Sequence, residues 1–316
     1  MQIFFMDGKD ISISMRVVFL GTGGTYPCTE RNVIAIAVQI GKDVLLLDCG
    51  EGTQRQFMRS TVSFMDTRWI FITHYHGDHF LGLPGLIQSM NLNDRKRPID
   101  IYGPEGTVEL MKCLLTAGYF KPSYKIVAHD VEPGEKIELT GFSVTACGAD
   151  HSVPSLAYSV AENDRPGRFN TEKANDLGVP KGPMYRKLQQ GESVKVGGKT
   201  IHPSDVLGPS RKGRKIVYSG DTKRCKEIIE LARDADMLIH DATLLSDEGE
   251  FAGDYGHSTA LDAAEVALEA KVGVLALIHY SPRYKETKLL AEEAKKVFKE
   301  TFAPSDLDEY VIRIND

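Results

Sequence analysis

The sequence predicts an α/β protein built as one layered sandwich of sheets with an internal duplication. Apolar runs of strand length alternate with segments of helical periodicity along most of the 316 residues. Strand after strand ends in a polar side chain able to bind a metal, and strand ends at one sheet edge are where α/β folds gather their sites. These side chains are Asp48, His74, His151, Asp221, His240 and His279. Because they span both halves of the chain, both halves must share one site.

The composition is that of a globular protein, with 26% charged residues. The net charge of -6 gives the whole protein a field that does not favour nucleic-acid binding. A local basic surface is still compatible with this net charge. No stretch approaches the roughly 20 apolar residues of a membrane span, and no signal-peptide pattern opens the chain. The 5 scattered cysteines, which form no CxxC pair, predict free thiols in a reducing cytoplasm and no disulfides.

The N-terminal third is predicted from β-branched runs separated by turn residues. Residues 1–14 form an N-terminal extension with Asp7-Gly8 as the turn of a candidate hairpin, and Met15 is an alternative start. Strands are predicted at 16–20, 33–40 and 44–47, and a helix at 53–58. The glycine loop that follows the first strand, Gly21 to Gly24, lacks phosphate-binding spacing and a lysine, which favours a tight turn with close backbone approach.

The rest of the chain repeats the alternation of strands and helices. Strands are predicted at 69–72, 100–102, 144–147, 215–218, 237–239, 274–278 and 310–314. One helix is predicted to follow the His/Asp-rich loop and to end at Asn91. Others are predicted at 108–115 and 289–302, and one begins after a cap at Ser258 or Thr259.

Four potential metal ligands crowd into the six residues from His74 to His79, directly after an apolar strand. His74 and His76 are two apart and can point the same way, while Gly77 permits a sharp turn. Asp78 and His79 then lie beyond that turn. Imidazole pairs with a carboxylate suit two adjacent metal ions, zinc above all, whereas a loop of merely solvated histidines does not explain this density.

Other polar residues allow structural interpretations. His129, in an ordinary strand-like run, and His202, before a proline in a polar loop, are interpreted as structural. Asp48 closes an apolar strand, where a carboxylate is costly unless it is hydrogen-bonded. It could orient a metal-binding histidine through the other ring nitrogen, or cap the helix that begins near Thr53, and both roles stay open.

Residues 162–200 differ in character, with few apolar residues and no sustained period. Such a segment is not expected to bury a core of its own, so we predict a protruding arm carried by the main domain. Basic residues outnumber acidic ones nearby: Arg165, Arg168, Lys173, Lys181, Arg186 and Lys187. An arm that binds a nucleic-acid backbone and a merely solvated loop are both compatible with this composition.

From Met15 onward the chain resembles the ribonuclease Z family of the metallo-β-lactamase superfamily. THYHGDHFLGLPGL is a superfamily-wide motif, and GTGGTYP, DCGEGTQRQ, SGDT, HDAT, GHST, HYSPRY and the arm are further points of resemblance. The resemblance implies a four-layer αββα sandwich over residues 15–316, with an exosite arm at about 162–200. It also implies a homodimer that removes the 3′ trailer from precursor tRNA, leaving a 3′-hydroxyl on the tRNA and a 5′-phosphate on the trailer.

The same resemblance implies two zinc ions per subunit, although manganese or iron could use the same ligands. One ion would be held by His74, His76 and His151, the other by Asp78, His79 and His279, with Asp221 as the bridge.

Catalytic roles are also implied. Asp78 corresponds to the family's catalytic base. His257, supported by Asp241 where glutamate is common, would stabilise developing charge or protonate the leaving oxygen. We expect Asp48 and His240 to orient metal-binding side chains by contacting the side of each that faces away from the metal.

Substrate contacts are implied in three places. The arm residues Gly178, Lys181, Gly182 and Pro183 resemble the exosite that grips the tRNA body. Residues 26–32, which include Arg31 and Asn32, resemble the loop that inspects the tRNA 3′ end, although this chain has Thr29 where lysine is usual. Arg283 is either a phosphate clamp or an exposed arginine.

Overall fold

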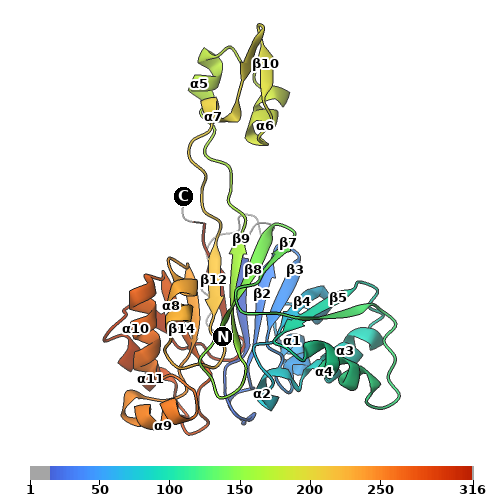
Figure 1. Ribbon diagram of the computed structural model, residues 1–316, viewed down its shortest axis with the longest axis vertical. Coiled ribbons are helices and arrows are strands. Elements are labelled where there is room, and N and C mark those ends of the chain that lie inside the picture. The colour runs from blue at the N-terminus through green and yellow to red at the C-terminus, as the bar shows by residue number, and fades with distance from the viewer. Residues whose placement is uncertain (1–14, 315–316) are drawn as a thin grey trace.

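Two seven-stranded sheets lie face to face in the computed structural model, which describes residues 15–314 (Figure 1). The candidate hairpin at Asp7-Gly8 lies outside the described residues. The first sheet has the order β16 (Glu309–Ile312), β1 (Met15–Gly21), β2 (Ala35–Ile40), β3 (Asp43–Leu47), β4 (Thr67–Phe71), β5 (Ile99–Gly103) and β6 (Ile126–Asp130). The second has the order β15 (Thr301–Phe302), β14 (Val274–Ile278), β13 (Met237–Asp241), β12 (Lys215–Tyr218), β9 (Leu156–Glu162), β8 (Phe142–Gly148) and β7 (Lys136–Leu139).

Both sheets follow one plan. Antiparallel neighbours, β1 to β3 in the first sheet and β7 to β9 with β12 in the second, give way to parallel neighbours. This repeated order agrees with the internal duplication expected from the distribution of polar strand ends.

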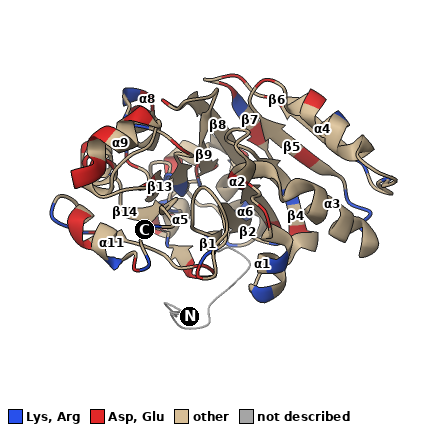
Figure 2. Cartoon of the chain, turned by 90° about the horizontal axis from the view of Figure 1, so that it is seen from below, with Lys and Arg blue, Asp and Glu red and all other residues tan. Residues whose placement is uncertain are grey.

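Helices cover the outer face of each sheet and complete the four layers. The first sheet carries α1 (Thr53–Arg59), α3 (Leu83–Leu92) and α4 (Thr107–Thr116); the second carries α8 (Lys226–Ala232), α10 (Ala260–Ala270) and α11 (Lys288–Ala294). Short elements line the edge opposite the arm: α2 (Gly77–Phe80), α9 (Gly249–Asp254) and the 3-10 turn Ser246–Glu248. Another 3-10 turn, Phe64–Asp66, precedes β4. Seen from that edge, α2 lies between the two halves of the sandwich (Figure 2).

The strand period of two explains the layering. In β1, Val17 and Phe19 face the other sheet, whereas Val18 and Leu20 belong to the core beneath the helices. The four-layer αββα prediction is therefore confirmed. No helix among the described residues is long and apolar enough to cross a bilayer, and all the cysteines are free thiols.

The C-terminal helix is shorter than predicted. The helix expected at 289–302 ends at Ala294, and Thr301 and Phe302 instead form β15. These two residues pair in parallel with Leu275 and Ala276 of β14, so a tertiary strand pairing overrides the local helical pattern. The strands β7 and β9 and the helices α8 and α9 were not among the elements predicted from the sequence.

The segment between β9 and β12 projects from the sandwich and is joined to it by two extended chain segments without regular secondary structure (Figure 1). It holds α5 (Thr171–Asp176), α6 (Pro183–Gln189), β10 (Val194–Val196), β11 (Lys199–Ile201) and α7 (Pro203–Val206). Contrary to expectation it buries a small core, made of Ala174, Val179, Leu188, Val194, Ile201 and Val206. The sequence pattern does not reveal this core, because its residues come from five short elements and one loop without a common period.

Because the arm packs its apolar residues against one another, its removal should leave the sandwich stable. Replacing residues 166–210 by a short glycine-serine linker should change the melting temperature by less than about 4 °C, the effect of roughly 1–2 kcal/mol in a domain of this size. Differential scanning calorimetry measures this. A fall of more than about 10 °C would show that the arm contributes to the sandwich core.

Candidate functional site

The strand ends that carry the predicted ligands meet at the edge of the sandwich opposite the arm. β4 ends at Phe71 and leads into His74 and His76, while β12 leads into Asp221. β14 leads into His279, and the loop after β8 carries His151. This arrangement confirms that both halves of the chain supply one site.

The first cluster consists of His74, His76, His151 and Asp221, whose ligand atoms lie within 4.8 Å of one another. His76 Nδ1 lies 3.0 Å from His74 Nε2 and 3.2 Å from His151 Nε2. Burial lowers the pKa of His74 to about 2 and also lowers those of His76 and His151. These imidazoles are therefore neutral and keep the lone pair that a metal ligand needs.

The second cluster consists of Asp78, His79 and His279. His279 Nε2 lies 3.3 Å from Asp78 Oδ2, and His79 Nε2 lies 3.7 Å from the same oxygen. Asp221 Oδ2 stands between the clusters, 3.2 Å from His279 Nε2, 3.3 Å from His79 Nε2 and 3.7 Å from His74 Nε2. Its position suits a carboxylate shared by two cations.

The ring nitrogens that face away from the clusters are occupied. His74 Nδ1 lies 3.0 Å from Thr73 Oγ1, and His279 Nδ1 lies 2.8 Å from Thr243 Oγ1. Likewise His79 Nδ1 lies 2.7 Å from Asp48 Oδ2, and His151 Nδ1 lies 2.7 Å from the carbonyl oxygen of Gly256. With Nδ1 donating outward, each of these rings directs the Nε2 lone pair at its cluster.

Within residues 15–314, His79 Nε2 and Asp221 Oδ1 are buried without a hydrogen-bond partner. Buried polar atoms are rarely left unsatisfied, and both of these belong to the clusters. A cation would satisfy them. The donor set of imidazole nitrogens and carboxylate oxygens fits zinc, and it also fits manganese or iron.

His257 and Asp241 form a pair beside the shared carboxylate. His257 Nδ1 lies 2.9 Å from Asp241 Oδ2 and 3.9 Å from Asp221 Oδ2. Burial alone would lower the pKa of His257, but the charge and hydrogen bond of Asp241 outweigh it and raise this pKa to about 9. His257 is thus cationic near neutral pH. The distance of 2.9 Å also shows that Asp241, although shorter than the glutamate common at this position, reaches His257.

Asp48 is buried and supports the ligands. Besides His79, it accepts hydrogen bonds from the Thr73 amide at 2.7 Å and from the Tyr218 hydroxyl at 2.6 Å. The alternative role as a helix cap is wrong, because α1 begins after Gly52 without a side-chain cap.

His240 differs from Asp48. Neighbouring residues of β13 face opposite sides of the sheet, so Asp241 points into the site and His240 away from it. His240 Nδ1 contacts the carbonyl oxygen of Asp241 at 2.8 Å, and His240 belongs to none of the metal-capable groups found among the described residues. The expectation that it supports a ligand side chain is not met.

Two of the expected substrate contacts have other partners. Arg31 is only 8% exposed, and its guanidinium donates to the carbonyl oxygens of Tyr284 at 2.5 Å and Lys285 at 3.4 Å. Arg283 pairs with Glu248 at 2.8 Å and lies over the Phe251 ring. Arg31 therefore links two loops, and Arg283 is not a free cation.

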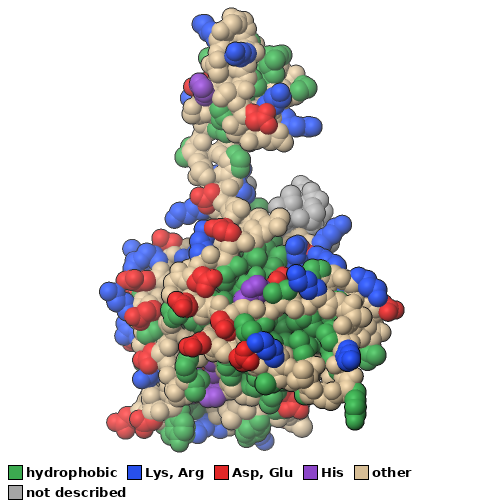
Figure 3. Space-filling model, turned by 45° about the vertical axis from the view of Figure 1, so that its right-hand side comes forward, with side chains coloured by type: hydrophobic (Ala, Val, Ile, Leu, Met, Phe, Trp, Pro, Cys, Tyr) green, Lys and Arg blue, Asp and Glu red, His purple; other side chains and the backbone are tan. Residues whose placement is uncertain are grey.

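The other expected contacts remain available to varying degrees. Asn32 is half-buried, and its backbone N–H donates to Asp306 Oδ2 at 2.7 Å. The arm residues Gly178, Lys181 and Gly182, between α5 and α6, and Pro183, the first residue of α6, are all exposed. Lysine and arginine side chains are spread over the surface of the arm (Figure 3).

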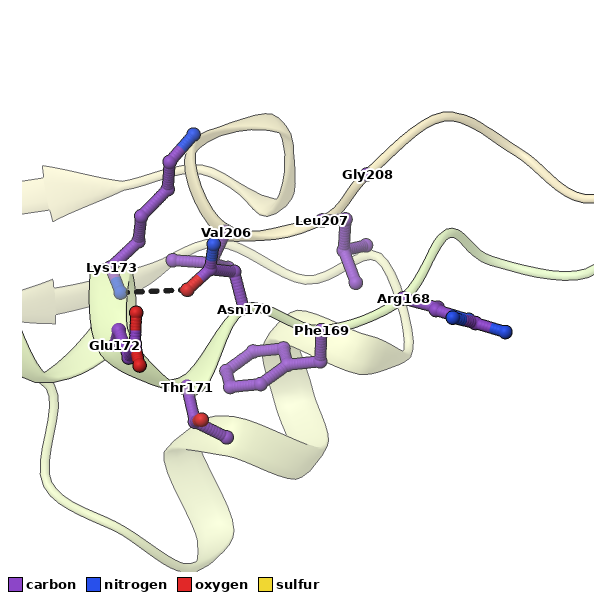
Figure 4. A pocket seen from close by; sticks show the side chains of 9 residues that line it. All are labelled: Arg168, Phe169, Asn170, Thr171, Glu172, Lys173, Val206, Leu207 and Gly208. Atoms are coloured by element: carbon purple, nitrogen blue, oxygen red, sulfur yellow. Dashed lines mark hydrogen bonds between the residues drawn. The ribbon is translucent and has the colours of Figure 1, made fainter.

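A cavity of about 380 Å³ lies at the neck of the arm, lined by residues 168–173 and 206–208. The cationic ends of Arg168 and Lys173 point away from each other there, and the Asn170 side chain accepts the Lys173 amide at 2.9 Å to begin α5 (Figure 4). The cavity gathers neither metal ligands nor a focused charge, so it does not compete with the histidine clusters as the reactive site.

Sequence reasoning missed the residues that hold the ligands. Thr243 accepts from His279 and donates to Asp241 Oδ1 at 2.7 Å. Thr25 donates its amide to Asp78 Oδ2 at 2.6 Å from a left-handed backbone with φ 72°. Their positions inside HDAT and directly after the glycine loop were the available signals.

Comparison with known proteins agrees with this geometry. The model of the family described as Anti-Pycsar protein Apyc1 matches residues 15–165, and that of a beta-lactamase superfamily domain matches 187–280. The short form of human tRNase Z is structurally similar, with a TM-score of 0.71 and 28% identity over 95% of this chain and 100% of that one.

Curated relatives match along nearly their whole length. Ribonuclease Z of Methanosarcina acetivorans is 46% identical over 94% of this chain and 98% of the relative. Ribonuclease Z of Archaeoglobus fulgidus is 49% identical over 92% and 95%. The chain therefore belongs to the ribonuclease Z family of the metallo-β-lactamase superfamily.

Proposed function

We propose that this protein is a zinc-dependent endoribonuclease that removes the 3′ trailer from precursor tRNA. The observation that carries the proposal is the pair of His/Asp clusters joined by Asp221 in a chain of the ribonuclease Z family. Two zinc ions per subunit fit these donors. When bound, they would supply Lewis-acid stabilisation of phosphate charge and a water of lowered pKa. The free cysteines fit a cytoplasmic location.

Asp78 is suited to position the attacking water. Burial alone would raise the pKa of this carboxyl, but when no metal is bound and His79 and His279 carry a second proton, the hydrogen bond from His279 and the charges of both rings outweigh burial and lower the pKa. Asp78 is therefore ionised, and while the Thr25 amide donates to its Oδ2 the carboxylate can accept the proton that the attacking water loses. A new bond from the water oxygen to phosphorus forms as the bond from phosphorus to the tRNA 3′ oxygen breaks.

His257 is suited to protonate that leaving oxygen. It is cationic through its contact with Asp241, and its ring stacks 5.0 Å from that of His279. Transfer of its proton yields a 3′-hydroxyl on the tRNA, and the trailer keeps a 5′-phosphate.

The arm is suited to hold the tRNA body, by shape and backbone contacts. It leaves the sandwich at the end of β9 and returns at the start of β12, whereas Asp221 follows the end of β12. Arm and clusters thus lie at opposite ends of the same strands, roughly 20 Å apart by strand length alone. We propose a homodimer in which each arm serves the partner's clusters.

Replacing Asp78 by alanine should abolish cleavage of a precursor tRNA with a labelled 3′ trailer, lowering kcat by at least about 10³-fold. Asp150→Ala is the matched control, because this carboxylate lies next to His151 but pairs with Lys223 at 3.3 Å. The wild type should make one cut near the discriminator. If Asp78→Ala cuts as fast as Asp150→Ala at equal zinc content, the role of Asp78 is disproved.

His257→Ala should lower single-turnover cleavage by about 10²–10⁴-fold, the usual contribution of a general acid. A substrate whose scissile 3′ oxygen is replaced by sulfur needs no proton on the leaving atom, and it should be cut by wild type and variant at rates within about tenfold. An equal loss on both substrates would exclude His257 as the acid.

Whether the arm of one subunit serves the clusters of its partner can be tested by mixing two proteins that are each impaired in tRNA cleavage. A variant with residues 166–210 replaced by a linker should lose at least about tenfold in kcat/KM for tRNA and still hydrolyse bis-p-nitrophenyl phosphate. Mixed with Asp78→Ala, which keeps its arm, it should recover tRNA cleavage, because the heterodimer joins an intact cluster to the partner's arm. Absence of recovery in isolated heterodimers would argue for an arm that acts on its own subunit.

A further inference from the structure

The glycine loop, residues 21–24, lies in direct contact with the second metal-capable cluster. A Cβ atom on Gly24 would lie 2.5 Å from His279 Cε1, so the loop backbone packs on that imidazole ring. One residue later, the Thr25 amide donates to Asp78 Oδ2. A shift of this loop by a fraction of an ångström would therefore displace both a histidine and a carboxylate of the cluster.

Asp306, in the turn between β15 and β16, fixes this loop. Its Oδ1 accepts hydrogen bonds from the Thr22 amide at 3.0 Å and the Thr22 hydroxyl at 2.9 Å. Its Oδ2 accepts from the Asn32 amide at 2.7 Å and from Gln56 Nε2 at 2.9 Å. One carboxylate thus joins the glycine loop to the start of the second strand and to α1.

The donors to Asp306 are all neutral groups. A half-buried carboxylate satisfied by neutral donors costs desolvation energy that an apolar residue would not. What it provides is geometry, since both oxygens accept in fixed directions. Three backbone hydrogen bonds also support the loop. The Gly23 amide donates to Asn32, the Gly24 amide donates to Tyr280, and the Tyr280 amide donates to the carbonyl oxygen of Thr22 at 3.2 Å.

We infer that Asp306 is a positioning residue that holds the glycine loop against Asp78 and His279 and thereby sets the geometry of the second cluster. The inference rests on the proposed metal centre for its functional consequence. The hold on the loop itself can be measured without metal.

The test uses Asp306→Asn, with Asp308→Asn as the matched control. An asparagine keeps the shape of Asp306, but whichever way its amide is turned at least one backbone N–H loses its acceptor. Asp308 is two residues away, and among the residues that the structure describes its side chain accepts only from the Ser305 amide of its own turn. Thr22→Val, which removes a single donor, is a milder second variant should Asp306→Asn not fold.

Hydrogen exchange of metal-free protein should show the backbone amide of Thr22 or of Asn32, whichever loses its acceptor, and the amides of residues 23–25 exchanging about tenfold faster or more in Asp306→Asn, as expected for one lost hydrogen bond. Titration with Co²⁺ alone, followed by its visible absorption, should show one of two equivalents binding about 10–100-fold more weakly. kcat for tRNA should fall with KM nearly unchanged. Asp308→Asn should match the wild type in each measurement.

Unchanged exchange, or faster exchange with unchanged Co²⁺ affinity, would overturn the inference while leaving the proposed function intact. Wild type that binds no Co²⁺ would overturn the proposed function, and with it the link from Asp306 to a metal cluster. These results are distinguishable because the first two concern only the variant and the third concerns the wild type.

Discussion

The site depends on one buried carboxylate, Asp221, held among imidazoles from both sheets. It is only 2% exposed, and ring nitrogens of His74, His79 and His279 lie within 3.7 Å of its Oδ2. A carboxylate in that position is tolerable only with cationic or hydrogen-bonding partners. Burial raises the pKa of Asp221, but the neighbouring histidines outweigh it and hold the pKa well below the usual value. The other strand ends are arranged around this requirement.

The two sheets meet that requirement with the same device. In the first, His74 contacts Thr73, whose hydroxyl donates to Asp48 at 2.9 Å. In the second, His279 contacts Thr243, whose hydroxyl donates to Asp241 at 2.7 Å. Each histidine–threonine–aspartate series fixes a ring so that Nε2 faces inward. The repetition of the device agrees with the shared strand order of the two sheets.

This precision has an energetic cost at the strand ends. Asp48, His279 and Thr25 all have left-handed backbones, with φ of 55°, 63° and 72°. Such conformations cost roughly 1–3 kcal/mol each for residues other than glycine and persist where the surroundings dictate them. Here the surroundings are hydrogen bonds between elements distant in sequence, such as that from Tyr218 of the second sheet to Asp48 of the first. In the arm, at the far end of the strands, the residues with left-handed backbones are all glycines. The arm packs around its own small core and is not bound by the hydrogen bonds that hold the site.

The sequence by itself determined the layered α/β class, the ligand types and the strand ends that carry them. Apolar periodicity is a local property, and the density of His and Asp from His74 to His79 has few structural explanations. The sequence could not determine whether Asp48 caps a helix or supports His79. It also could not determine that His240 points away from the site while Asp241 points into it, or that Arg31 is buried against carbonyl oxygens.

Only the tertiary structure decided those points, together with the arm's core and the end of α11 at Ala294. Each depends on which side of a strand faces the site, or on a partner far away in the chain. Asp306 shows this most clearly, because its partner Thr22 is 284 residues away and no local pattern marks the pair. Local periodicity encodes secondary structure, whereas hydrogen bonds between distant loops exist only once the sheets have packed.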